Sequence, residues 1–222
     1  MLFRSPRRVR TPAQFIWSAS LVVFLLSSWT SRVDIGVRHV LLLIPLVVMA
    51  VLQRVSTMLA GKSRAMVAAA CAVLVVQASS ALAIAPQYLG YFNTFAGGPE
   101  NGYRRLADTN VDWGQDLPAL RATLARLGAK RPLLAYFGGV APAEYGVFGV
   151  EWPGTAQSRA AVDWVAISAT YLDGMYLDTD PFAPFRAIPP SDRAGYSILL
   201  FAADRADVQR ALHEALAREG SE

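Results

Sequence analysis

The sequence is short of reactive and metal-binding side chains. It contains one cysteine, Cys71, and two histidines, His39 and His213, among 222 residues. A single cysteine inside an apolar run cannot build a disulfide framework or a zinc site. Neither histidine has a serine or cysteine partner in an arrangement typical of nucleophilic catalysis. Gly97 and Gly98 belong to no phosphate-binding glycine pattern. The sequence therefore predicts no catalytic triad, no nucleotide loop and no zinc site.

Acidic residues are scarce in the first part of the chain. Residues 1–85 carry nine Lys/Arg and one acid, Asp34, whereas residues 86–222 carry twelve Lys/Arg and sixteen Asp/Glu. The net charge of +4 therefore combines a basic first part with an acidic remainder. The basic residues flank apolar segments, and no basic domain is left to hold a phosphate backbone. We expect no nucleic-acid partner.

Apolar residues, in contrast, are abundant. They make up 54% of the chain, charged residues make up 17%, and the mean hydropathy is +0.31. These values are typical of a protein inserted in a membrane. Three apolar runs predict about three transmembrane helices in residues 1–86, at about 13–31, 36–53 and 65–86. The central run, Val40–Leu52, is short enough that it needs the residues before it to cross a bilayer.

Lysine and arginine residues predict how these helices are oriented. Four arginines precede the first apolar run, and Arg54, Lys62 and Arg64 separate the second from the third. Basic loops stay on the cytoplasmic side of a membrane. The expected arrangement is a protein of the cell membrane with a cytoplasmic N-terminus and an extracytoplasmic C-terminal domain.

Residues 87–222 have the pattern of a small α/β domain. Leucines recur at helical spacing over residues 117–127, and residues 205–219 predict an amphipathic helix. Short apolar runs predict buried strands at 132–137, 162–169 and 196–202. The predicted fold class is therefore a membrane α-helical N-terminal part followed by a small extracytoplasmic α/β domain.

The sharpest local pattern is Asp108-Thr-Asn110-Val-Asp112-Trp-Gly114-Gln-Asp116. Its alternating oxygen side chains resemble a calcium-binding loop, but the glycine is one place late and the twelfth position lacks the bidentate Glu. A divalent cation is therefore a weak expectation. The other interpretation is that Asp112 or Asp116 caps the following helix while Asn110 fixes a turn.

A second candidate site is the pair Arg38 and His39. A buried arginine at membrane depth requires a partner or a bound anion. A lipid-linked phosphate is such an anion, and the planar arginine fork suits it. The alternative is an ordinary ion pair between Asp34 and Arg38, four residues apart on a helix.

Several of these segments together resemble a known family. The resemblance lies in Gly36-Val-Arg38-His39, Tyr88-Leu-Gly-Tyr-Phe-Asn93, Ala96-Gly-Gly-Pro99 and Asn110-Val-Asp-Trp-Gly-Gln-Asp116. They are similar to the C-terminal part of bacterial membrane glycosyltransferases of the dolichyl-phosphate-mannose protein mannosyltransferase-like family, which is related to the aminoarabinose transferase. The resemblance covers residues 32–120 well and the remainder to 201 loosely.

The resemblance implies transfer of a sugar from a polyprenyl-phosphate donor at the outer membrane face. It also implies that the catalytic acid lies in an N-terminal outer loop that this chain does not contain. We therefore expect no catalytic residue here and no activity from the isolated chain. Membrane lipid, the polyprenyl-phosphate sugar donor and the missing catalytic part of the enzyme are the expected partners. Arg38 and His39 would bind the lipid phosphate. An acceptor-side or scaffold loop would comprise Asn110, Asp112, Trp113, Gln115 and Asp116.

The alternative function is a non-enzymatic, membrane-anchored module that binds a glycan or a partner protein outside the cytoplasm. Its binding rim would consist of aromatic residues, because aromatic faces stack on sugars and on protein partners. The rim predicted from the sequence contains Trp113, Tyr145, Trp152 and Tyr171.

Overall fold

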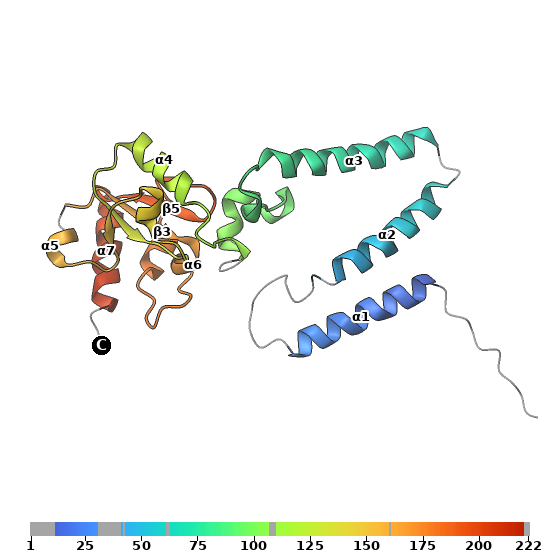
Figure 1. Ribbon diagram of the computed structural model, residues 1–222, viewed down its shortest axis with the longest axis horizontal. Helices are drawn as coiled ribbons and strands as arrows, with labels where there is room; N and C mark the ends of the chain where they lie inside the picture. Colours follow the sequence, from blue (N-terminus) through green and yellow to red (C-terminus); the bar gives the residue numbers. More distant parts are fainter. Residues whose placement is uncertain are drawn as a thin grey trace, which may run out of the picture. The chain divides into compact units, whose positions relative to one another are not determined.

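The structure is a computed structural model that describes residues 12–30, 41, 43–60, 63–106, 110–159 and 161–219. The chain divides into two compact units, Met1–Ser79 and Ser80–Glu222. In the first unit, helices α1 (Pro12–Thr30) and α2 (Leu43–Leu59) contact each other (Figure 1). Helix α3 (Arg64–Ala83) begins in the first unit and ends in the second.

The expectation of three transmembrane helices is wrong for the described part of the chain. There, only α3 is long and apolar enough to cross a membrane, judged by its length and composition. The described apolar stretches of the other two helices are shorter, at Gln14–Leu26 and Leu43–Met58. The second half of α2 contains Gln53 and Arg54, which leaves too little apolar length for a span of about 20 residues. The fold is therefore a mixed α/β domain preceded by one candidate span.

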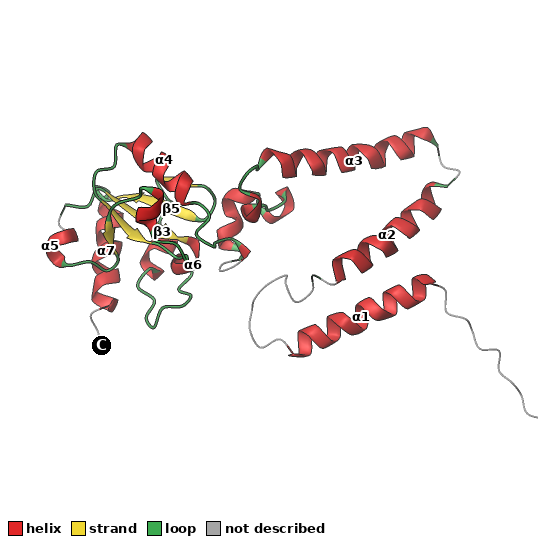
Figure 2. Cartoon of the chain, viewed as in Figure 1, coloured by secondary structure: helices red, strands yellow, loops and turns green. Residues whose placement is uncertain are grey.

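The second unit is built on a five-stranded mixed sheet with the order β2-β1-β3-β5-β4 (Figure 2). Strand β1 pairs in parallel with both β2 and β3, whereas β5 pairs antiparallel with both β3 and β4. The strand bounds are β1 Pro132–Ala135, β2 Val150–Glu151, β3 Trp164–Ser168, β4 Asp192–Ala194 and β5 Ile198–Ala202. The three predicted strand segments contain β1, β3 and β5, and the two short edge strands were not predicted.

Alternate residues of the central strands enter two separate cores. In β3, Val165 and Ile167 pack with the apolar face of α7 (Ala206–Glu219), while Ala166 packs with α4 (Leu117–Leu127). This alternation follows from the two-residue period of a strand. Buried residues of α7 include Val208 and Ala211, as the helical pattern predicted. The sheet is therefore covered by α7 on one face and by α4 on the other.

Shorter helices complete the second unit. After α3 come three 3₁₀ helices, η2 (Tyr88–Gly90), η3 (Thr94–Ala96) and η4 (Pro99–Arg104). Connections between the strands contain η6 (Pro142–Tyr145), α5 (Ala156–Arg159), α6 (Ala169–Leu172) and η7 (Ala183–Ala187).

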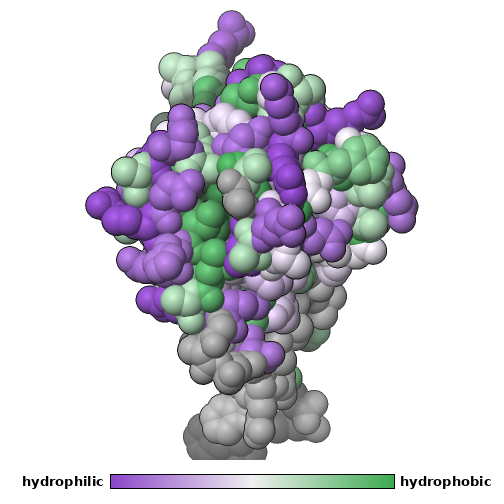
Figure 3. All heavy atoms as spheres, turned by 90° about the vertical axis from the view of Figure 1, so that its left-hand side faces the viewer, coloured by the Kyte–Doolittle hydropathy of each residue, from purple (hydrophilic) through white to green (hydrophobic). Residues whose placement is uncertain are grey.

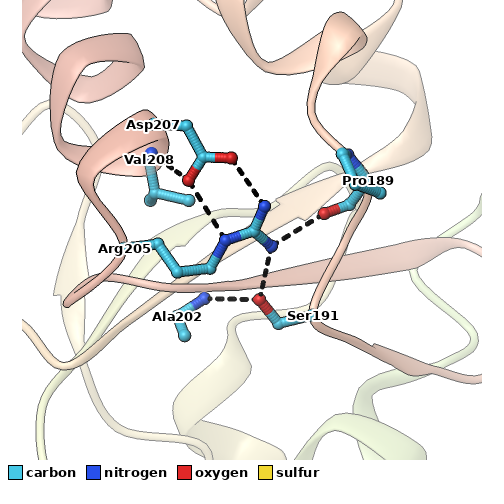
Figure 4. A network of polar contacts seen from close by, with 6 residues as sticks. All are labelled: Pro189, Ser191, Ala202, Arg205, Asp207 and Val208. Atoms are coloured by element: carbon cyan, nitrogen blue, oxygen red, sulfur yellow. Dashed lines mark hydrogen bonds and ion pairs between the residues drawn. The ribbon is translucent and has the colours of Figure 1, made fainter.

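The beginning of α7 is fixed by one arginine (Figure 4). Arg205 donates from Nε and Nη2 to the carboxylate oxygens of Asp207, at 3.1 and 2.7 Å. Its Nη1 donates to Pro189 O at 2.9 Å and to Ser191 Oγ at 3.0 Å. The hydrogen bond from Arg205 lowers the pKa of Asp207. This network ties α7 to the chain that enters β4.

The face of the α/β domain in Figure 3 is mainly hydrophilic, with hydrophobic residues in narrow groups between polar ones. Such a mixture is ordinary for a protein surface in water. This face therefore suits a domain that lies in an aqueous compartment.

Candidate functional site

The loop of residues 110–116 lies at the carboxyl ends of the parallel strands β1 and β3, which we call this edge of the sheet. β1 and β3 are parallel, so Tyr136, which follows β1, and Ser168, the last residue of β3, lie at the same edge. β5 runs the opposite way, so Ser197 precedes it at this edge too. Asp112 lies beside Ser168 and Ser197. In α/β sheets, ligands commonly bind outside the carboxyl ends of parallel strands.

Asp112 is the most unusual ionisable group of this edge. Its side chain is fully buried, and its Oδ1 accepts a hydrogen bond from Gly114 N at 3.1 Å. No described residue donates to its Oδ2 in good geometry. Burial raises the pKa of Asp112 to about 6, and the Gly114 amide and the surrounding hydroxyls of Ser168 and Ser197 only partly offset that rise. The site can therefore hold or release a proton near neutral pH.

Tyr136 connects this buried acid to the outside of the domain. Its hydroxyl donates to Gly114 O at 3.3 Å. Burial, together with the nearby charges of Asp112 and Tyr145, raises the pKa of Tyr136 to about 12, so its hydroxyl stays protonated and remains a donor. Gly114 has φ +75°, and a Cβ added there would collide with the Tyr136 hydroxyl oxygen. Glycine is therefore required at 114.

Asp116 has a structural task. It is 2% exposed, and its Oδ2 accepts hydrogen bonds from Tyr196 N, Ser197 N and Ser197 Oγ, each at 2.9 Å. It occupies the N-cap position of α4, but its side chain makes no capping hydrogen bond. The predicted capping role is therefore wrong, because the carboxylate is used by the turn between β4 and β5 instead. Gly195, at φ +58°, makes room for it.

Gln115 fixes the loop internally, while Trp113 points outward. Gln115 Oε1 accepts from Trp113 N at 2.7 Å, and its Nε2 donates to Val111 O at 2.9 Å. Trp113 is 55% exposed, and Asn110 is partly buried. Gln115 and Asp116 therefore stabilise the structure of this loop. Asp112 is the functional candidate of the loop, because its buried carboxyl has a raised pKa that folding alone does not require.

Tyr136 also lines a hollow of about 420 Å³. Its lining combines aromatic rings, two carboxylates and a glycine-containing loop, and includes Tyr136, Trp152, Tyr171, Glu151, Glu219 and residues 138–142. The size lies in the range of small-ligand sites, about 300–1,000 Å³. No lysine or arginine contributes to the described lining. The hollow therefore suits a neutral or cationic ligand with hydroxyl groups.

Aromatic packing holds the walls of this hollow. The rings of Trp152 and Phe182 lie 4.8 Å apart, and those of Tyr171 and Phe182 lie 6.5 Å apart. Nε1 of Trp152 is buried and has no hydrogen-bond partner among the described residues. Of the predicted aromatic rim, Trp152 and Tyr171 meet at the hollow, whereas Trp113 and Tyr145 do not line it.

The structure leaves the predicted lipid-phosphate site untested and gives no support to the predicted cation site. Arg38 and His39 lie outside the described residues, so the lipid-phosphate site stays a prediction. For the divalent cation, the described residues contain no group of three or more metal-binding side chains. The carboxylates of Asp112 and Asp116 bind different partners, on Gly114 and on the β4–β5 turn. A shared cation site between these two residues therefore has no support.

Sequence reasoning missed Tyr136, Ser168, Ser197, Glu151 and Glu219. A signal existed for the two serines, because Ser168 is a small polar residue near the end of one predicted buried strand and Ser197 is one near the start of another. The glutamates gave no signal, since exposed acids are common and only the fold brings them to one hollow.

Comparisons with known proteins add no family to this geometry. Protein-family models, curated proteins and solved structures were each compared with the chain, and none of the three comparisons finds a match.

Proposed function

We propose that the chain is the C-terminal portion of a membrane glycosyltransferase that takes its sugar from a polyprenyl-phosphate donor at the outer face of the cell membrane. Helix α3 would cross the membrane, with Arg54 and Lys62 before it and Arg64 as its first residue, all on the cytoplasmic side. The α/β domain would then lie outside the cytoplasm and serve the acceptor side of the reaction.

The observation that carries this proposal is the link made by Tyr136. Its hydroxyl donates to the loop of residues 110–116, which contributes to the resemblance to the glycosyltransferases, and its side chain lines the hollow. The loop therefore braces a wall of the hollow. This supports an acceptor-side role for the loop through Tyr136, since Asp112 is enclosed and Gln115 and Asp116 are occupied with backbone contacts.

The chemistry assigned to this chain is binding. Asp112 is shielded from solvent, so it cannot contact an acceptor in the described arrangement. The acid that activates the acceptor would come from the N-terminal part of the enzyme. Arg38 and His39 would bind the phosphate of a polyprenyl lipid. Because they precede α3, on the same side of it as Arg54, this site would lie on the cytoplasmic side and would not act on a phosphate that leaves at the outer face.

Lipid retention tests the predicted lipid-phosphate site. We expect the full chain, purified in mild detergent, to retain polyprenyl phosphate that mass spectrometry detects. Arg38→Ala should lose it, because a permanent, planar cation is removed from the phosphate. Arg54→Ala, an arginine change in α2, is the matched control and should keep the lipid. Equal lipid retention by wild type and Arg38→Ala would refute this site.

A second candidate function is favoured by the hollow itself. A membrane-anchored module without enzymatic activity could bind a glycan there, with sugar rings against Trp152 and Tyr171 and hydroxyls donating to Glu151 and Glu219. This function needs no donor lipid and no catalytic part. A gene for a many-span protein beside this one would favour the transferase, and an isolated gene would favour the binding module.

Calorimetric titration of the full chain in detergent tests the hollow, with mannose and N-acetylglucosamine oligosaccharides as probes. Glu151→Ala should weaken binding about tenfold, since a hydrogen bond to a charged group contributes about 1.5 kcal/mol or more. Glu144→Ala, an exposed glutamate in η6 that does not line the hollow, should leave the affinity unchanged. An affinity that stays unchanged in Glu151→Ala would show that the hollow is the binding site in neither of the two proposed functions. Binding of glycan without retention of lipid would favour the second function.

A further inference from the structure

The chain that follows α3 is attached firmly to the end of that helix. The last turn of α3 and residues 84–106 belong to the same compact unit. Ser80 Oγ and Tyr91 Oη lie 3.0 Å apart. Ala85 N donates to Leu82 O at 3.1 Å, which continues the turn beyond the helix. These contacts hold the start of the segment next to the end of α3.

Within this segment, residues 93–97 form a tight turn that we call the Phe95 turn. Asn93 Oδ1 accepts from Ala96 N at 2.9 Å, and Gly98 N donates to Asn93 O at 3.0 Å. Gly97, at φ +98°, accepts at its carbonyl from Asn101 Nδ2 at 3.0 Å. The backbone is thus held by several hydrogen bonds, and its conformation does not depend on the phenylalanine.

The ring of Phe95 is nevertheless fully exposed, at 101%. Burial of a phenylalanine side chain contributes about 1.5–3 kcal/mol. Phe95 is not alone, because Leu89 and Leu106 of the same segment are also exposed, at 38% and 42%, and several exposed apolar side chains together mark an interaction or membrane surface. Tyr88, at 55% exposure, lies in the same segment and offers a second aromatic ring.

We infer that the Phe95 turn inserts into the headgroup region of the bilayer. Aromatic side chains favour the membrane interface. Arg104 and Arg105, both exposed and close by in sequence, can bind the phosphates of anionic lipids. The inference rests on the proposal that α3 crosses the membrane, since α3 would bring this segment to the bilayer surface. The turn would then fix how far the α/β domain stands from the membrane.

Fluorescence quenching in liposomes tests the inference on the full chain. The liposomes contain phosphatidylcholine and phosphatidylglycerol, and nitroxide groups are placed either near the headgroup or near the end of the acyl chain. A polarity-sensitive dye is attached to Phe95→Cys in a Cys71→Ser background. The same dye on Phe148→Cys serves as the matched control, because Phe148 is also highly exposed, at 72%, but follows η6 in the chain, outside residues 84–106. The dye on native Cys71 reports on α3 itself.

We expect quenching of the Phe95→Cys label to be strongest with nitroxide near the headgroup, and we expect no quenching of the Phe148→Cys label. A quenched Cys71 label with an unquenched Phe95→Cys label would overturn the inference while leaving the span intact. An unquenched Cys71 label would instead refute the membrane span. Shielding of the Phe95→Cys label that depends on protein concentration and not on lipid would indicate a second copy of the chain, and it would also overturn the inference.

Discussion

Replacement of Asp112 by asparagine should stabilise the α/β domain at neutral pH and not in acid. The pKa of this carboxyl rises from 3.8 to about 6 because the side chain is buried. A difference of about two units corresponds to about 3 kcal/mol between the two protonation states. The folded protein therefore incurs a cost of that order when Asp112 ionises.

The direction of the pH dependence follows from the proton count. Between pH 3.8 and about 6, folded Asp112 holds its proton while the unfolded chain releases it. The contribution of Asp112 to the free energy of unfolding is therefore complete below pH 3.8 and is lost as the pH rises through about 6. The variant Asp112→Asn carries no charge at this position at any pH, so it escapes that loss. The difference in stability between the variant and the wild type should grow across this window.

Thermal unfolding of the full chain in detergent, followed by near-ultraviolet circular dichroism from pH 4 to pH 8, provides the measurement. The melting temperature of Asp112→Asn relative to the wild type should rise by about 10 °C between the two ends of the range, from about 3 kcal/mol in a domain of this size. The comparison at pH 4 is the internal control, because the wild-type carboxyl is then protonated as well. A difference that stays constant with pH would refute the reasoning, since burial would then impose no cost on the ionised form.

Two further substitutions test the scaffold around this site. Asp116→Ala should destabilise the domain by about 3 kcal/mol or more, because it leaves three donors without an acceptor, two of them buried on Ser197 and one partly buried on Tyr196. Chemical denaturation measures this loss, and a value below about 1 kcal/mol would show that water replaces the carboxylate. Gly195→Ala should cost more than Gly128→Ala in the same assay. Both glycines have positive φ, at +58° and +64°, but an added Cβ would collide with the Asp116 carboxylate at position 195 and would meet nothing within 4 Å at position 128. Equal costs would mean that backbone strain alone decides the outcome.

Periodic patterns in the sequence predicted the central part of the α/β domain. The apolar face of α7 and the runs that contain β1, β3 and β5 are long enough to show helical spacing or a buried strand. The edge strand β2 has only two residues, which is too short for any pattern. The membrane part was overpredicted because an apolar run shorter than a bilayer still forms a helix, as α2 does.

The site was predictable only in part, because its chemistry depends on contacts between distant segments. Asp112 and Asp116 look equivalent in the sequence, and each could have been a ligand or a cap. The structure separates them, since Asp116 receives three hydrogen bonds from the β4–β5 turn while Asp112 keeps one oxygen without a donor among the described residues. Local sequence spacing could not predict this difference between Asp112 and Asp116, because the β4–β5 turn lies about eighty residues further along the chain.

The reach of Asp116 also constrains how the domain is made. Its partners Tyr196 and Ser197 leave the ribosome some eighty residues after it, together with β5, which lies between β3 and β4 in the sheet. Until then the nascent chain contains no donors for the carboxylate of Asp116, and β3 has no antiparallel strand to pair with. During synthesis from the N-terminus to the C-terminus, the loop of residues 110–116 therefore stays exposed to solvent, and it becomes buried only after β5 has been synthesised.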